Sequence, residues 1–167
     1  MGEFILLSQL RAPPEQLWAH STSLSGLKQE LAPWLSLTPP SNAAAEGLHA
    51  ALSGAVPGLT RLGPLRVTLG WLIPIRLYDL GISGVELGKR FTQYARTRSL
   101  STWEHERSIQ ARIVDGKPEC TLVDRVVWET RPWVPEMLVR SVIHLIFRHR
   151  HRRLNAQFGA GRVLPRR

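Results

Sequence analysis

His105, Arg107 and Asp124 are the side chains of this sequence whose types and spacing could do chemistry together. An arginine beside an aspartate could orient the carboxylate or carbonyl group of a ligand, and it could equally be a structural ion pair. A histidine titrates near neutral pH, so His105 could act as a general acid or base, or could be a hydrogen-bonded wall residue. Which of these holds depends on how the surrounding elements place the three side chains.

The two segments that carry these residues, 102–114 and 119–130, alternate apolar and polar side chains, which is typical of β-strands. Asp115-Gly116 between them favours a two-residue hairpin turn. Such a turn sets Arg107 opposite Asp124, and opposite charges across strands stabilise a pairing. The same register places Glu106 opposite Arg125, Ile109 opposite Leu122 and Trp103 opposite Trp128.

The preceding strand, Arg90–Arg98, extends this sheet, with Arg96 or Arg98 expected opposite Glu104 or Glu106. One face is then charged and belongs in water: Tyr94, Arg96, Arg98, Glu104, Glu106, Arg125 and Glu129. The other face is apolar with four embedded polar groups: Phe91, Gln93, Ala95, Thr97, Trp103, His105, Arg107, Ile109, Leu122, Asp124, Val126 and Trp128. A few polar groups in an apolar concavity are typical of small-molecule sites.

A long helix is expected from Val134 to about Phe158, and its first half is apolar almost all round: Met137, Leu138, Val139, Val142, Ile143, Leu145, Ile146 and Phe147. Such a helix must be covered on more than one side. A curved sheet wrapped around it would do this and would readily leave a hollow. The lining expected for a ligand there is Phe91, Gln93, Trp103, His105, Arg107, Asp124, Trp128, Leu138, Val142 and Leu145.

The rest of the chain predicts an α+β fold with an antiparallel sheet. The expected elements are a strand at Phe4–Leu10, short helices at Glu15–Ser21 and from a Ser23 or Ser25 cap to Leu31, and strands at Leu65–Ile75 and Leu77–Leu87. Gly88-Lys89 is expected as a two-residue turn, and 38–64 as loop with a helical turn or two at Ala43–Leu52. Residues 1–159 are expected to form one domain, followed by a basic tail at 160–167.

The net charge of +9 is concentrated near the carboxyl end, because no acidic residue follows Glu136 and eight arginines do. The Arg148–Arg153 cluster could be a solvated helix end or a transient contact with an anionic membrane surface. Nucleic acid is disfavoured, because the run is short and lacks a reading motif. No apolar stretch approaches the ~20 residues that span a bilayer. The amino terminus lacks a basic signal region, and the single cysteine, Cys120, fits a reducing cytoplasm.

His144, His149 and His151 do not favour a metal site, because His149 lies off the face that the other two share and no carboxylate follows Glu136. Cys120 has no evident partner base and is expected to be an inert buried thiol. No cofactor is expected.

The chain resembles the SRPBCC or START-like superfamily in three segments: Ala12–Trp18 after the first strand, Trp103–Arg107 with Leu122–Val126, and Phe147–Leu154 with Phe158-Gly159. The resemblance implies a helix-grip fold, in which a curved antiparallel sheet grips a long carboxy-terminal helix. It also implies binding of a lipid-like or polyketide-like molecule. The alternative is a cyclase or dehydratase that uses His105 with Arg107 and Asp124, although no catalytic signature of such members is present.

Overall fold

The structure is a computed structural model that describes residues 1–38, 60–69 and 73–161. Along the chain the elements are β1 (Gly2–Leu10), α1 (Pro14–Thr22), α2 (Leu24–Leu31), β2 (Leu35–Thr38), β3 (Thr60–Leu69), β4 (Ile73–Glu86), β5 (Arg90–Thr97), β6 (Leu100–Val114), β7 (Lys117–Thr130) and α4 (Glu136–Phe158). The segment Ala43–Leu52, expected as a helical turn or two, lies outside the described residues.

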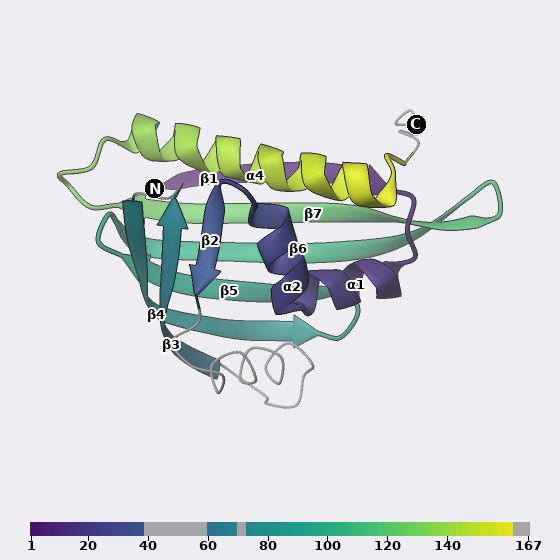
Figure 1. The fold of residues 1–167 in the computed structure, drawn as a ribbon, viewed down its shortest axis with the longest axis horizontal. Helices are drawn as coiled ribbons and strands as arrows, with labels where there is room; N and C mark the ends of the chain where they lie inside the picture. Colours follow the sequence, from purple (N-terminus) through teal and green to yellow (C-terminus); the bar gives the residue numbers. More distant parts are fainter. Residues whose placement is uncertain (39–59, 70–72, 162–167) are drawn as a thin grey trace.

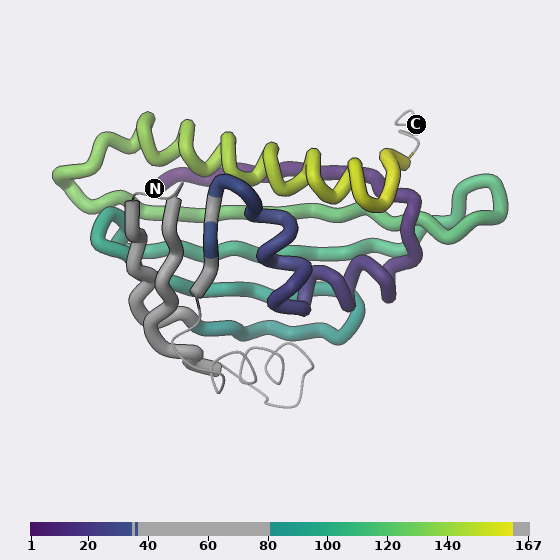
Figure 2. The backbone as a smooth tube through the Cα atoms, viewed as in Figure 1, coloured from purple at the N-terminus to yellow at the C-terminus, as the bar shows by residue number. Residues whose placement is uncertain are grey.

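One antiparallel sheet of seven strands organises the fold, in the order β1-β7-β6-β5-β4-β3-β2. Figure 1 shows the sheet curving, with α4 lying along β1 and β7 and with α1 and α2 crossing in front of the central strands. The tube in Figure 2 shows the same course, in which the first strand and the last helix run side by side although they lie at opposite ends of the sequence. The predicted α+β helix-grip architecture is confirmed.

The β6–β7 hairpin has the predicted register. Asp115 and Gly116 adopt φ values of 50° and 74°, as a tight hairpin turn of this kind requires, and Arg107 lies opposite Asp124. Trp103 likewise lies opposite Trp128. The hairpin could be predicted because its turn chemistry, charge pairs and alternation all specify one register.

The β5–β6 pairing differs from the expected one. Glu104 lies opposite Tyr94 and Glu106 opposite Thr92, so the prediction that Arg96 or Arg98 faces these glutamates was wrong. The side chain of Thr97 accepts from the backbone N–H groups of Ser99 and Leu100, at 3.1 and 2.9 Å, and closes the turn earlier than expected. The observed pairing differs from the predicted pairing by an even number of residues, so each side chain stays on the face of the sheet that was predicted for it.

Two other boundaries were misplaced. The sequence predicts one strand over Leu65–Ile75, but this run holds the end of β3 and the start of β4, which pair with each other. The turn at Gly88 has three residues rather than two, because Glu86 pairs with Arg90. Gly88 has a φ of 73° in this turn, a value that glycine adopts without the strain that a Cβ atom would cause.

The short helices begin where the sequence marks them. Pro14 opens α1, and the Ser23 hydroxyl accepts from the N–H of Gly26 at 2.9 Å to cap α2. α2 then packs against α4 across the concave side of the sheet, and its residues Glu30 and Leu31 are buried. Beyond α4 the chain returns to β1, where Ala160 forms a bridge with Leu10.

The apolar core lies on the concave face in two parts. One cluster joins β1, α1 and the end of α4: Leu10, Leu17, Ile109, Cys120, Leu122 and Leu154. The other joins the opposite ends of β6 and β7 to the first half of α4: Leu100, Val126, Trp128, Ile143 and Phe147, with Trp103 packed against it. Trp103 and Trp128 therefore face α4, as predicted. The described part of the chain contains no helix long and apolar enough to cross a membrane.

Part of the predicted lining from α4 was placed on the wrong side. Leu138 and Leu145 are 60% and 52% exposed, because the helix turns Val139, Ile143 and Phe147 toward the sheet instead. An all-round apolar pattern does not by itself say which side the sheet covers.

This difference between the two sides of α4 is measurable. We expect Leu154→Ala to lower the free energy of unfolding by about 2–5 kcal/mol, because Leu154 is fully buried. Leu145→Ala, the same change on the exposed side, should cost under about 0.5 kcal/mol. Urea unfolding of both variants tests the orientation, and equal losses would contradict it.

Candidate functional site

Arg107 lies at the centre of the concave face, and protein atoms satisfy its whole guanidinium group. Its Nε and Nη2 donate to the two carboxylate oxygens of Asp124, each at 2.8 Å. Its Nη1 and Nη2 donate to Glu30 at 2.8 and 3.0 Å, and Nη1 also donates to Ser21 at 3.2 Å. A guanidinium has five N–H donors. All five are therefore used within the protein.

Arg150 of α4 completes a buried ion network, by which we mean Glu30, Arg107, Asp124 and Arg150. Its Nε and Nη2 donate to Glu30 Oε2 at 2.9 and 2.7 Å. Two arginines thus face two carboxylates, and the network is neutral overall. It connects α2, β6, β7 and α4 at one point, so the helices are fixed on the sheet by charge-assisted hydrogen bonds.

Two histidines flank Asp124. His105 Nε2 donates to Oδ1 and His151 Nε2 donates to Oδ2, each at 3.0 Å. The other ring nitrogens are also engaged: the amide Oε1 of Gln93 lies 3.0 Å from His105 Nδ1, and Ser8 Oγ donates to His151 Nδ1 at 2.7 Å. A neutral His105 that donates from Nε2 accepts at Nδ1, which requires the Gln93 amide to be turned so that its NH₂ group takes the place of Oε1 beside the ring.

The chain Ser8–His151–Asp124 has the residue types of a hydrolytic triad, but its electrostatics do not suit that chemistry. In a triad the aspartate stabilises the imidazolium that forms when the serine loses its proton. Here Arg107 already neutralises Asp124 with two hydrogen bonds. The arrangement therefore fits a structural hydrogen-bond chain between β1, α4 and β7.

Burial and ion pairing shift the pKa values of the groups in this network in opposite directions. Burial raises the pKa of Glu30, but Arg107 and Arg150 outweigh it and bring the pKa down to about 2. Burial likewise raises the pKa of Asp124, and Arg107 with His105 holds it well below its usual range. For His105, burial lowers the pKa more than the neighbouring Asp124 raises it. Ionised carboxylates beside neutral imidazole are thus the stable state at neutral pH.

The residues expected to line a ligand site fall into four groups. His105, Arg107 and Asp124 belong to the buried polar cluster. Phe91 and Trp128 are packed core residues, Phe91 against Trp18 of α1. Leu138 and Leu145 point outward. Gln93, Trp103 and Val142 are half-buried.

Glu30, Arg150 and His151 were not singled out as inward-facing residues. Glu30 sits on a short amphipathic helix, where a charged residue is expected in water, and Arg150 and His151 lie inside a basic run that suggested a solvated end. The available signal was periodicity: Arg150, Phe147 and Leu154 are three or four residues apart and therefore share a helix face.

Several side chains on the inner wall next to the ion network are half-buried rather than fully buried. Gln93 and Trp103 keep partial exposure although both belong to the concave face, whose neighbouring residues are buried. The Trp103 ring lies 6.2 Å from that of Phe147 on α4. From the helix, Val139, Val142 and Ile146 are half-buried as well. Trp103, Val139 and Ile146 lie at the border of the core cluster that joins β6, β7 and the first half of α4, and each keeps part of its surface exposed.

A separate cleft of about 490 Å³ opens between the start of α1 and the β4–β5 turn, lined by Pro14, Leu87, Lys89 and Ala111 among others. None of the expected site residues contributes to it. Within the described ranges, no group of three or more histidine, cysteine, aspartate or glutamate side chains is arranged to hold a metal ion. Burial raises the pKa of the Cys120 thiol to about 11, so this thiol is a poor nucleophile.

Comparison with known proteins places the chain in a family. The family described as "Domain of unknown function (DUF8410)" matches residues 8–158. The chain belongs to the DUF8410 family. No curated protein matches the sequence.

Solved structures match the DUF8410 chain in fold. A START superfamily protein from Mycobacterium smegmatis superposes with a TM-score of 0.63 at 12% identity, covering 93% of this chain and 96% of that one. The protein XoxI from Bacillus cereus gives 0.64 at 10% identity, covering 95% and 96%. A protein from Chromobacterium violaceum gives 0.59 at 14% identity, covering 96% and 100%. The DUF8410 chain therefore has the START-like fold that the sequence resemblance implied.

Single and paired substitutions test the ion network. Arg107→Met should cost about 3–5 kcal/mol of unfolding free energy, because it leaves two buried carboxylates with one arginine. Adding Asp124→Leu restores the charge balance, so the double variant should be more stable than Arg107→Met alone. Urea unfolding measures both, and strictly additive losses would contradict a coupled network.

The pH dependence of stability has a definite sign. The pKa of His105 is lowered in the folded state, so below about pH 6.5 the unfolded chain gains protons first and stability falls. The ionised carboxylate of Glu30 contributes to the free energy of unfolding above about pH 4.5. This contribution is lost as the pH falls toward the folded-state pKa of Glu30, about 2. That fall in pKa from 4.5 corresponds to roughly 3 kcal/mol for Glu30 alone.

Thermal unfolding between pH 8 and pH 2 is the measurement, with His105→Gln as the control variant. The decline that begins near pH 6.5 should be smaller in this variant, whereas the decline below pH 4.5 should remain. A melting temperature that does not change between pH 7 and pH 4 would show that the buried histidine does not contribute.

Proposed function

We propose that this DUF8410 protein binds a hydrophobic small molecule, lipid-like or polyketide-like, in a hollow between the inner sheet face and the first half of α4. The observation that carries the proposal is the partial exposure of Gln93 and Trp103 on an otherwise buried concave face. An indole that faces inward and remains accessible is suited to contact an apolar ligand. The START-like fold supports the same location.

Gln93 is the polar group best placed to orient such a ligand. One end of its amide is held by His105, which is held in turn by Asp124. A half-buried glutamine fixed in this way offers the other end of its amide to the hollow. A ligand with one hydroxyl group on an apolar body would donate to the amide oxygen at that end.

Binding without chemistry fits the contacts of His105 better than catalysis does. A general base must reach the proton that it removes. Both ring nitrogens of His105 are engaged, by Gln93 and Asp124, and Arg107 has no N–H left for a substrate. A cyclase or dehydratase role for these residues would require the network to open.

A dye-binding measurement tests the location of the hollow. We expect Trp103→Gln to weaken binding of an anilinonaphthalene sulfonate dye at least tenfold, because it removes the apolar wall and adds an unpaired amide. Tyr94→Gln is the matched control, because Tyr94 lies on the outer face of the neighbouring strand and is exposed. It should change the affinity less than about twofold. Equal effects of the two variants would contradict a site on the inner face.

A further inference from the structure

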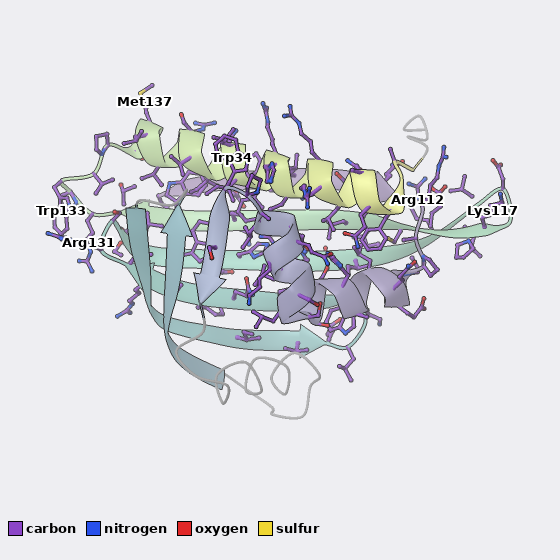
Figure 3. All side chains as sticks on the ribbon, in the orientation of Figure 1. Trp34, Arg112, Lys117, Arg131, Trp133 and Met137 are labelled. Carbon is purple, nitrogen blue, oxygen red and sulfur yellow. The ribbon has the colours of Figure 1, made fainter. Side chains whose placement is uncertain are left out.

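The outward side of α4 presents an apolar strip that no described element covers. Met137, Leu138 and Leu145 are 82%, 60% and 52% exposed, and Trp133, just before the helix, is 66% exposed. Figure 3 shows Met137 pointing away from the sheet, with Trp133 and Arg131 at the same end of the molecule. Large exposed apolar side chains gathered on one helix are uncommon on a surface that meets only water.

Helical spacing continues this strip into basic residues. At 100° per residue, Arg148 and Arg152 point to the same outward side as Met137 and Leu145, and both are exposed. We call these six residues, Trp133, Met137, Leu138, Leu145, Arg148 and Arg152, the α4 docking surface. Its first half is apolar and its second half is basic.

The structure corrects the composition of the expected basic cluster. Arg150, in the middle of the Arg148–Arg153 run, points inward and binds Glu30, and Arg153 Nε donates to the Gln29 carbonyl at 3.3 Å. Arg148 and Arg152 remain outward. The charge available to a partner therefore lies beside the apolar strip, and not at the helix end alone.

Charge favours an anionic partner over a second copy of this chain. No acidic residue follows Glu136, and the net charge of +9 is concentrated in this part of the sequence. Pairing two copies through the α4 docking surface would bring arginines of the same sign together. The guanidinium carbon of Arg131 lies 5.6 Å from the centre of the Trp133 ring. Tryptophan is an amphipathic residue that is enriched at membrane interfaces.

We propose that the α4 docking surface binds the surface of an anionic lipid bilayer. The helix lies parallel to the membrane plane, the apolar first half enters the boundary between head groups and acyl chains, and the arginines bind lipid phosphate and carboxylate groups. The proposal is independent of ligand binding in the hollow, because the two sites lie on opposite sides of α4.

Flotation with vesicles tests this surface on the full chain. Wild-type protein should bind vesicles of phosphatidylcholine with phosphatidylserine, bind pure phosphatidylcholine far less, and lose binding as salt rises. Arg148→Gln with Arg152→Gln should lower the partition coefficient about 25-fold, at roughly fivefold for each arginine. Leu138→Ser with Leu145→Ser should lower it at least about tenfold. Met137→Ser should lower it by a smaller factor.

The control pair is Arg96→Gln with Arg98→Gln, which removes the same charge from the exposed outer face of the sheet and should change binding less than about threefold. All variants change exposed residues, and far-UV circular dichroism reports that they remain folded. Absence of binding to phosphatidylserine vesicles would overturn the proposal, and so would equal losses from the two arginine pairs. A wild-type dimer that the leucine pair dissociates would show that a second copy covers this face instead.

Discussion

The salt-bridged guanidinium of Arg107 is the interaction on which the arrangement of this molecule depends. It donates to Asp124 on β7 and to Glu30 on α2, while Glu30 also accepts from Arg150 on α4. Burying four charges is expensive unless each is paired and hydrogen-bonded. The sheet, α2 and α4 must therefore meet at one point, and this point sets the distance at which the last helix is held from the sheet.

That constraint divides the concave face into regions with different roles. Around the network and toward the end of α4, side chains from β1, α1 and β7 form a packed core. Near the first half of α4 a second packed cluster forms around Trp128 and Phe147, and Trp103 and Gln93 remain partly accessible. The ion network therefore fixes α2 and α4 on the sheet between these two clusters, and it lies beside the proposed ligand site.

The β6–β7 hairpin and the face of each central strand could be predicted because they are local. Asp115-Gly116 specifies the turn, and alternation then assigns every side chain between Trp103 and Trp128 to a face. The ion network could not be completed in the same way. Glu30 meets Arg107 only when a helix far away in the sequence docks on the sheet, and Leu138 and Leu145 could not be assigned to a side from an all-round apolar pattern.

The proposed site for a hydrophobic small molecule lies inside the grip, beside Trp103. Native mass spectrometry of gently purified protein, before and after incubation with a lipid extract, tests this most directly. We expect a species heavier than the bare chain by the mass of one small molecule, which organic solvent releases. A chain that keeps its bare mass under both conditions would contradict the central claim.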